Sequence, residues 1–326
     1  MSVRPNLFLV GAPKCGTTAL AQYLSEREDV FFCAPKEPFF LADDIPGLRE
    51  MTFLPDEAAY LKLFEAADPA RHKIVAEGST AYLRSTRAIP AALEMSPDAR
   101  FIAMLRDPVK IAHGYHMEQI YDRNEDVEDF ETAWRLQDAR AGGQAISPHA
   151  RIPAFLQYED TARIGEQLER FFAAVPQDRR LVLLQEDLLK DPRGTWLKVQ
   201  AFLGLPDDGR EEFPPVNPSR KHRFPWLANL VLDPPGPLKR PVYALRAWLV
   251  RTRPPIIEKI KASLRKEQAR EALSPEFEAE LRALFLPEVE KVETLLGRDL
   301  SAWKPAAAPA PASDPASDPA GARAAG

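Results

Sequence analysis

The sequence has few cysteines and no long apolar run. Its 326 residues include two cysteines, Cys15 and Cys33. These are too few for a disulfide framework or a structural zinc site, so we expect free thiols in a reducing compartment. The first apolar run, Leu7 to Val10, is too short for a signal peptide. No stretch approaches the ~18 apolar residues of a membrane-spanning helix. These absences predict a cytoplasmic protein.

An excess of positive charge is also missing. The formal net charge is -5 at pH 7, which gives the chain no global attraction to nucleic acid, so we expect no nucleic-acid partner. Hydrophobic residues make up 45% and charged residues 28% of the chain, as in ordinary soluble globular proteins. A chain of this length has room for one large α/β domain or two small ones.

The last residues, 305–326, contain no aromatic and no β-branched side chain. Almost all of them are alanine, proline, serine, aspartate or glycine, so this segment has too little apolar surface to bury. We therefore predict a disordered Ala/Pro-rich tail at 305–326 and place the folded domain in residues 1–304.

Short apolar runs alternate with helical patterns along this domain. Such runs are typical of buried parallel strands. They occupy residues 6–10, 72–79, 99–108 and 179–188. The alternation predicts an α/β fold, with a doubly wound parallel sheet flanked by helices in a single domain.

Two further helices are predicted near the end of the domain. One covers residues 194–205 and the other, which is amphipathic, covers 275–297. Ser274 and Pro275 suit the N-cap and first position of the second helix, and Gly297 suits its C-cap.

The segment GAPKCGTT, residues 11–18, joins the first predicted strand to a helix. Gly11 and Gly16 have the separation of the two glycines in the phosphate loop of nucleotide triphosphatases, where a lysine follows the second glycine. Here Thr17 follows it, and Lys14 lies two residues before it. The loop is therefore P-loop-like, but it places no lysine over a γ-phosphate in the usual way.

The other features of an anion site are retained in this loop. Its backbone N–H groups, including those of Cys15 and Gly16, form a nest at the positive N-terminus of the next helix. Thr17 and Thr18 add hydroxyl donors, and Lys14 is able to reach the bridging region of a phosphoanhydride. The pattern favours a site for one 5′-phosphate carrying a reactive group over a plain strand–turn–helix connection.

Motifs along the chain follow the order of a known family. PKCGTTAL resembles the 5′-phosphosulfate loop of the sulfotransferase superfamily, whose members use 3′-phosphoadenosine 5′-phosphosulfate (PAPS). KEPFF (36–40), EGSTAYL (77–83) and LRDPVKIAHGYHM (105–117) resemble motifs of its heparan-sulfate or carbohydrate branch. LLGRDLSAW (295–303) resembles a closing motif. The resemblance spans roughly residues 6–304 and makes a PAPS-dependent sulfotransferase the leading hypothesis.

The resemblance implies PAPS as the sulfuryl donor, no required metal, and roles for several residues. Lys14 would contact the leaving phosphate, Glu37 would act as the base, and Lys36 would help to hold the sulfuryl oxygens. For Glu77, the sequence leaves two roles open, substrate positioning and an ion pair. The implied acceptor is a hydroxyl or amine of a glycan or glycolipid.

The expected 3′-phosphate site departs from the family pattern. Arg106 ends a predicted strand, where a doubly wound sheet binds its ligands, and the resemblance assigns it to the 3′-phosphate. The family carries a serine eight residues later, where this chain has Gly114. The missing hydroxyl removes a hydrogen bond worth about 1.5–3 kcal/mol. His113 or His116 either compensates for it or has only a packing or surface role.

A second basic cluster lies in NPSRKHRFP, residues 217–225. It resembles the family loop that closes over the cofactor, in which Arg220 and Lys221 would face phosphate, with His222 as a further candidate. The alternative is a solvated basic loop. The whole segment from 220 to 270 holds thirteen lysines and arginines and three acidic residues, so a solvated surface, an anionic substrate and a peripheral membrane contact are all considered.

Two other functions remain as alternatives. A P-loop nucleotide kinase or triphosphatase would need a lysine directly after Gly16 and an aspartate for magnesium, and the first is absent. A non-catalytic phosphonucleotide-binding homologue is favoured by Gly114. The presence of Lys14, Glu37 and Arg106 argues against it.

Overall fold

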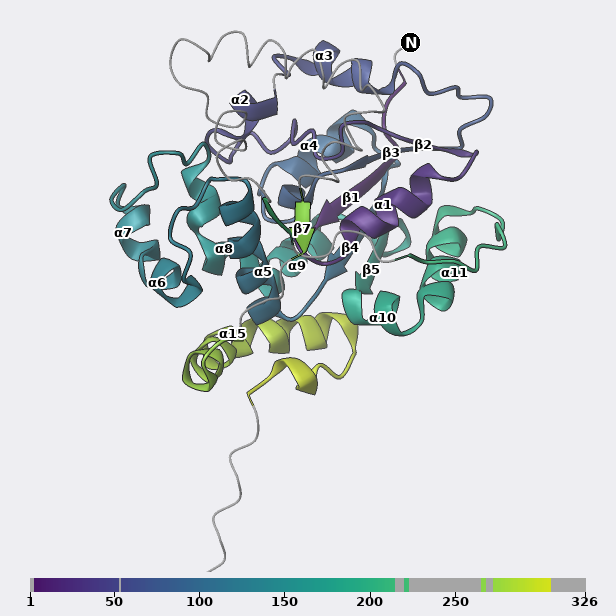
Figure 1. The fold of residues 1–326 in the computed structure, drawn as a ribbon. Helices are drawn as coiled ribbons and strands as arrows, with labels where there is room; N and C mark the ends of the chain where they lie inside the picture. The colour runs from purple at the N-terminus through teal and green to yellow at the C-terminus, as the bar shows by residue number, and fades with distance from the viewer. Residues whose placement is uncertain (1–2, 53, 215–219, 223–264, 268–271, 306–326) are drawn as a thin grey trace, which may run out of the picture.

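The chain forms a five-stranded parallel sheet with helices packed around it (Figure 1). The computed structural model describes residues 3–52, 54–214, 220–222, 265–267 and 272–305. Across the sheet, the strands are β2 (Val30–Phe32), β3 (Ile74–Gly78), β1 (Leu7–Gly11), β4 (Arg100–Leu105) and β5 (Arg180–Leu184). All neighbouring pairs are parallel. The predicted α/β fold is therefore confirmed.

Four of these strands coincide with the predicted apolar runs. The sequence pattern does not predict β2, because three residues are too few to show a period. Two short segments outside the main sheet, β6 (Arg220–His222) and β7 (Arg265–Glu267), pair in the antiparallel direction.

Twelve α-helices lie among the described residues. Those before β5 are α1 (Thr17–Ser25), α2 (Leu48–Thr52), α3 (Glu57–Leu61), α4 (Ala88–Met95), α5 (Pro108–Tyr121), α6 (Phe130–Arg135), α7 (Gln137–Ala141), α8 (Tyr158–Ala162) and α9 (Ile164–Ala174). Those after it are α10 (Gln185–Lys190), α11 (Pro192–Leu203) and α15 (Pro275–Leu296). A short 3₁₀ helix, η2 (Thr80–Tyr82), follows β3 and contributes to the site.

The ends of α15 follow the predicted capping pattern. The Ser274 hydroxyl accepts a hydrogen bond from the N–H of Phe277 at 3.2 Å, and Pro275 occupies the first helical position. Gly297 ends the helix with a φ of 61°, which a glycine adopts without strain. α15 packs against α9, and this contact joins the end of the domain to one layer of helices.

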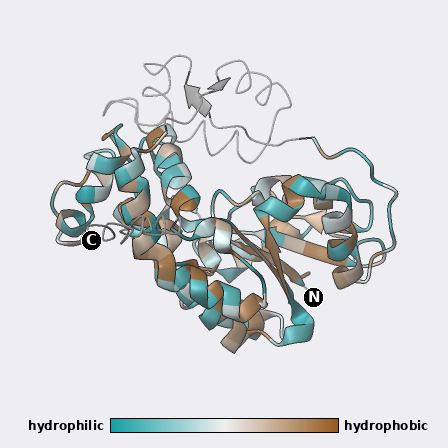
Figure 2. Ribbon diagram, turned by 90° about the horizontal axis from the view of Figure 1, so that it is seen from below, coloured by the Kyte–Doolittle hydropathy of each residue, from teal (hydrophilic) through white to brown (hydrophobic). Residues whose placement is uncertain are grey.

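The sheet is covered on both faces. The side chains of β1 and β3 are buried throughout, as expected for central parallel strands, and Figure 2 shows the strands in the hydrophobic colours. On one face, Phe101 of β4 stacks on Phe8 and meets Phe171 of α9. On the other face, Tyr23 of α1 contacts Trp196 of α11 edge-to-face at a centroid distance of 6.2 Å.

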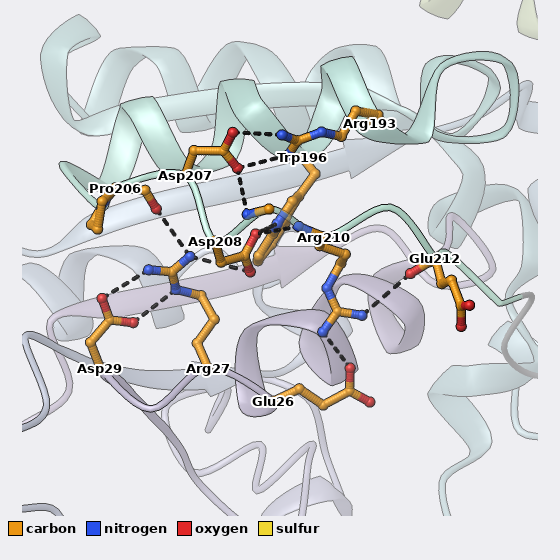
Figure 3. Close-up of polar contacts among 11 residues, drawn as sticks. Glu26, Arg27, Asp29, Arg193, Trp196, Pro206, Asp207, Asp208, Arg210 and Glu212 are labelled. Atoms are coloured by element: carbon orange, nitrogen blue, oxygen red, sulfur yellow. Dashed lines mark hydrogen bonds and ion pairs between the residues drawn. The ribbon is translucent and has the colours of Figure 1, made fainter.

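A charged network fixes the chain that leaves α11 (Figure 3). Arg27 forms a bidentate pair with Asp29, donates to the carbonyl of Pro206 and lies 3.3 Å from Asp208. Arg210 pairs with Glu26 at the end of α1. These contacts join the end of α1 to residues 206–210 and so fix the position of the segment that follows α11.

A fully buried ion pair fixes the segment after α5. Arg140 of α7 donates two hydrogen bonds to the Glu125 carboxylate, at 2.6 and 2.9 Å, and the Tyr158 hydroxyl donates a third at 2.6 Å. The side chains of Arg140 and Glu125 are 1% and 0% exposed. Such a pair is costly to break from one side, because the remaining charge stays buried without a partner.

Two parts of the sequence-based prediction lie outside the described residues. These are residues 306–326 of the predicted tail, and most of the basic segment from 220 to 270. The division at residue 304 therefore stays a prediction.

We predict that Arg140→Met lowers the free energy of unfolding by roughly 3–5 kcal/mol, because Glu125 then keeps an uncompensated buried charge. Chemical denaturation followed by circular dichroism measures the change. The matched control is Arg87→Met, which removes a pair with Asp43 from a side chain that is 66% exposed. The control should have a much smaller effect, and equal losses in the two variants would contradict the prediction.

Candidate functional site

The loop between β1 and α1 requires glycine at both of its glycine positions. Gly11 has a φ of 139°, and a Cβ there would lie 2.6 Å from the carbonyl oxygen of Thr80. Gly16 has a φ of 89° and forms the left-handed N-cap of α1. Side chains other than hydrogen are disfavoured at both values. The loop therefore bends tightly and brings its backbone close to whatever binds there.

The N-terminus of α1 is open to an anion. No side chain caps it, and its first turn contains no acidic residue, so the first N–H groups remain available. Thr18 faces the adjacent cavity, whereas Thr17 is buried. The Cys15 thiol is fully buried and donates to the carbonyl of Pro13, and burial raises its pKa. The Cys15 side chain is therefore a buried, neutral thiol, and only the backbone N–H of Cys15 is a candidate donor to an anion.

The sheet topology brings Arg106 to this loop. β1 and β4 are neighbours, and the chain leaves β1 toward β2 but leaves β4 toward β5, in the opposite direction. Such a switch point opens a crevice at the carboxyl ends of the two strands. Arg106, directly after β4, donates to the carbonyl oxygen of Lys14 at 3.2 Å. Arg106 is therefore in direct contact with the loop that carries Lys14.

Lys36 and Glu37 reach the same region from the loop after β2. Lys36 Nζ lies 2.5 Å from Glu37 Oε1, and the Thr80 hydroxyl donates to Glu37 Oε2 at 3.0 Å. The backbone N–H of Glu37 donates to the carbonyl of Gly78, at the end of β3. Both carboxylate oxygens of Glu37 thus have a donor, which holds the carboxylate in one orientation.

The backbone is strained where these residues lie. Lys14, Glu37 and Phe39 all have positive φ, at 62°, 65° and 52°. For residues with a side chain such values are sparsely populated and persist only where the surrounding contacts impose them. Three such residues in two loops beside one crevice are consistent with a site that needs these side chains in fixed positions.

Glu77 has a different role from either of the two predicted ones. Its carboxylate is fully buried and accepts hydrogen bonds from three hydroxyls, those of Tyr60 (2.5 Å), Ser79 (2.5 Å) and Tyr82 (3.1 Å). It neither faces the cavity nor forms an ion pair among the described residues. Burial raises its pKa to about 7. The sequence did not reveal this role, because the three partners come together only in the folded chain.

The hydroxyls around Glu77 also hold the loop that carries Glu37. Ser79 Oγ accepts from the N–H of Phe39 at 3.0 Å, and the Tyr82 hydroxyl accepts from the N–H of Leu41 at 3.1 Å. The buried network therefore connects the end of β3 to the residues directly after Glu37.

A cavity of about 280 Å³ opens beside Glu37. Its apolar walls include Phe39, Tyr115 and Phe155, and its charged walls include Glu37 with Lys36. The remaining charged lining residues are Arg84, Glu118, Asp122 and Arg151. A small cavity with mixed apolar and polar walls next to a fixed carboxylate is suited to orienting a small part of a substrate.

Helix α5 carries the expected 3′-phosphate position. Gly114 is buried within it, and the strand β6, with Arg220 and Lys221, contacts the same helix. Of the basic cluster at residues 217–225 the structure describes only the backbone of 220–222, so the contact of Arg220 and Lys221 with phosphate stays a prediction.

The structure gives both histidines of α5 a packing role. His116 is 2% exposed, bonds through Nε2 to the carbonyl of Val127, and burial lowers its pKa. His113 stacks on Phe130 with ring centroids 5.1 Å apart. Of the two alternatives left open by the sequence, these contacts favour packing over replacement of the missing serine.

The described part of the chain shows neither a metal-binding cluster nor a membrane-spanning helix. No group of three or more histidine, cysteine, aspartate or glutamate side chains among the described residues is arranged to hold a metal ion. No helix in the described ranges is long and apolar enough to cross a membrane.

Comparison with known proteins identifies the family of this site. A family model described as the sulfotransferase domain matches residues 4–215. The chain belongs to the sulfotransferase family. The matched region runs from before β1 to the residues after α11, so it includes the loop of residues 11–18, Glu37 and Arg106.

Individual sulfotransferases agree with this assignment. Heparan sulfate glucosamine 3-O-sulfotransferase 3B1 of Mus musculus is 28% identical over 202 residues, which cover 62% of this chain and 46% of that protein. Carbohydrate sulfotransferase 15 of Homo sapiens is 29% identical over 166 residues, covering 39% of this chain and 29% of that protein. The chain thus spans about half the length of the first relative and less of the second.

A solved sulfotransferase has the same fold. The crystal structure of the sulfotransferase from Alicyclobacillus acidocaldarius superposes with a TM-score of 0.67 at 24% sequence identity. The match covers 92% of this chain and 99% of that one. The likeness extends over nearly the whole domain and supports the sulfotransferase fold predicted from the motifs.

The sequence identified only part of this arrangement. Lys14, Lys36, Glu37 and Arg106 were predicted, and they lie at the carboxyl ends of neighbouring strands. Thr80 and the α5 residue Glu118 were missed. A weak signal existed for Glu118, because it follows Gly114 by four residues and therefore lies on the same side of a helix.

We predict that Glu77→Gln changes the pH dependence of stability. The pKa of Glu77 is raised from 4.5 to about 7, so the folded protein keeps a proton that the unfolded chain has released. The stability of the wild type relative to the variant should therefore fall by about 3 kcal/mol between pH 4 and pH 8. Urea denaturation at several pH values measures it. A stability difference that is constant over this range would contradict the prediction.

Proposed function

We propose that this chain is a sulfotransferase that moves a sulfuryl group from PAPS to a hydroxyl or amine of an acceptor. The observation that carries the proposal is that Lys14 and Glu37 both lie beside Glu118: Glu37 and Glu118 line one cavity, and Lys14 Nζ lies 3.7 Å from Glu118 Oε1. Lys14 comes from the loop after β1, and Glu37 comes from the loop after β2 and faces the cavity. A cation for the leaving group and a base for the acceptor then flank the position of the transferred group.

The residues around the loop fit the donor. Gly11 and Gly16 allow the backbone to approach a 5′-phosphate closely, and the uncapped N-terminus of α1 offers N–H donors to it. Cys15, Thr17 and Thr18 would contribute N–H groups, and Thr18 also a hydroxyl. Arg106 would hold the 3′-phosphate with a two-pronged guanidinium contact.

The 3′-phosphate would have further partners on α5 and β6. Gly114 lacks the hydroxyl of the family serine, so Arg220 and Lys221 become the next candidates. The backbone position of β6 beside α5 supports this assignment.

The chain's own groups would carry the acid–base and electrostatic work. PAPS supplies the sulfuryl group. The bond between sulfur and the 5′-phosphate oxygen breaks as the acceptor oxygen or nitrogen bonds to sulfur. The rest of PAPS leaves as adenosine 3′,5′-bisphosphate. Glu37 accepts the proton of the acceptor, and Lys14 stabilises the negative charge on the departing phosphate. Lys36, which now pairs with Glu37, would stabilise the sulfuryl oxygens. With fixed cations of this kind, the proposed transfer requires no metal ion.

A carbohydrate is the acceptor class that we favour. The names of two relatives describe sulfation of heparan sulfate glucosamine and of carbohydrate. The cavity combines aromatic walls, Tyr115 and Phe155, with polar groups that suit a sugar ring. A glycan or glycolipid acceptor is therefore proposed, with peripheral membrane contact through residues 220–270 as a further hypothesis. We propose a cytoplasmic location on the sequence pattern alone.

We predict that adenosine 3′,5′-bisphosphate raises the melting temperature of the protein and that ATP with magnesium does so much less. The physical reason is that Thr17 occupies the position of the triphosphatase lysine, so no cation is placed for a γ-phosphate. Thermal shift measures both ligands in parallel. Stabilisation by ATP with magnesium alone would favour the kinase or triphosphatase alternative over a sulfotransferase.

We predict that Glu37→Gln abolishes transfer of labelled sulfate from PAPS to acceptors in a host lysate, because the amide cannot accept the proton. Binding of adenosine 3′,5′-bisphosphate should be retained, since Glu37 lies on the acceptor side. Lys14→Ala should lower both transfer and nucleotide binding. Isothermal titration provides the binding measurement.

The two variants therefore separate the roles of base and leaving-group cation. Normal turnover in Glu37→Gln would remove Glu37 as the base. A folded wild type that binds the bisphosphate but transfers sulfate to no acceptor would support the non-catalytic alternative.

A further inference from the structure

Lys14 already has an anionic partner. Its Nζ lies 3.7 Å from Oε1 of Glu118, and the two side chains are 25% and 38% exposed. Lys14 comes from the phosphate-binding loop, and Glu118 comes from the last turns of α5. The lysine that the proposed function assigns to the leaving phosphate therefore points toward a carboxylate of the protein in this structure.

The surroundings of Glu118 make this pair more than a surface contact. Glu118 lines the cavity beside Glu37, so its exposed surface opens into the cavity. Desolvation by the cavity walls raises the pKa of Glu118, the charge of Lys14 opposes that shift, and the charge of Glu37 adds to it. Lys14 is thus the nearby cation that most favours the ionised form of Glu118.

We propose that Glu118 is a positioning residue that competes with the donor phosphate for Lys14. The proposal rests on the proposed function, because it takes Lys14 as a ligand of the 5′-phosphate. One ammonium group has a limited number of donors, and binding of the phosphate draws it away from Glu118. The ion pair holds Lys14 at the boundary between the loop and the cavity until the nucleotide arrives.

The proposed competition predicts the direction in which nucleotide affinity changes when Glu118 is replaced. In the wild type, nucleotide binding must weaken or break the contact between Lys14 and Glu118. Without the Glu118 charge, that cost is absent, so nucleotide affinity should rise. A partly exposed ion pair corresponds to a change of roughly two- to five-fold in the dissociation constant. If Glu118 instead had only a structural role, its loss would leave affinity unchanged or lower it.

The test is a double-mutant cycle with adenosine 3′,5′-bisphosphate as the probe. Isothermal titration of the full chain measures the dissociation constant for the wild type, Glu118→Gln, Lys14→Ala and the double variant. We expect Glu118→Gln to bind the bisphosphate roughly two- to five-fold more tightly. In the Lys14→Ala background the same substitution should have little effect, because the competing partner is gone.

A matched control separates the effect of the Lys14–Glu118 pair on nucleotide affinity from the effect of removing any negative charge nearby. Asp122, the C-cap of α5, lies one turn after Glu118 and lines the same cavity. The charge of Lys14 acts on it, but the two residues form no described ion pair. Asp122→Asn should therefore tighten binding less than Glu118→Gln. Equal tightening by both, or tightening that persists in Lys14→Ala, would overturn the pairing and indicate only a long-range field.

The proposal and the proposed function fail in different ways. If wild-type protein binds no bisphosphate, the donor assignment fails, and the inference about Glu118 falls with it. If the wild type binds and Glu118→Gln binds equally or more weakly, only the inference is overturned. Thermal melting of each variant without ligand confirms that the compared proteins are folded.

Discussion

The site depends on the position of β1 between β3 and β4. Parallel pairing on both sides places the carboxyl ends of all three strands at one edge of the sheet. The loop after β1, the residues after β3 and Arg106 after β4 therefore meet without any of them being adjacent in sequence. The close approach of Gly11 to the Thr80 carbonyl shows how tightly these ends are packed. A side chain at Gly11 would separate the loop of residues 11–18 from the residues after β3.

A buried polar network connects the end of β3 to the loop that carries the candidate base, Glu37. No cation pairs with Glu77 in the described part of the chain, and three hydroxyls provide its hydrogen bonds instead. Two of those hydroxyls, on Ser79 and Tyr82, accept backbone N–H groups from the residues after Glu37. A buried carboxyl that lacked these donors would be strongly unfavourable. The network thus fixes the Glu37 loop, because moving the loop would leave several buried polar groups unpaired.

Each of the two lysines proposed to act in the site is paired with a carboxylate in this structure. Lys36 pairs with Glu37, and Lys14 pairs with Glu118. Each pair holds a proposed catalytic group near its working position and limits the cost of placing an isolated charge in a partly desolvated cavity. The function proposed here requires both pairs to rearrange, since Lys14 must turn to phosphate and Glu37 must accept a proton. Binding and catalysis would therefore exchange existing ion pairs for new ones.

The sequence by itself determined the features that depend on neighbours along the chain. The apolar runs predicted four of the five central strands, and the caps of α15 followed from Ser274, Pro275 and Gly297. The glycines and lysine of residues 11–18 predicted an anion site, because loop geometry is a local property. The order of the motifs predicted the sulfotransferase family.

Only the tertiary structure decided which distant side chains meet. It revealed the strand β2, gave Glu77 a buried supporting role, placed His116 in the core and paired Lys14 with Glu118. None of these follows from a local pattern, since each depends on the direction in which a side chain points after the sheet has assembled. The physical reason is that spacing along a helix or strand fixes which face a residue occupies, whereas packing of the elements fixes what that face contacts.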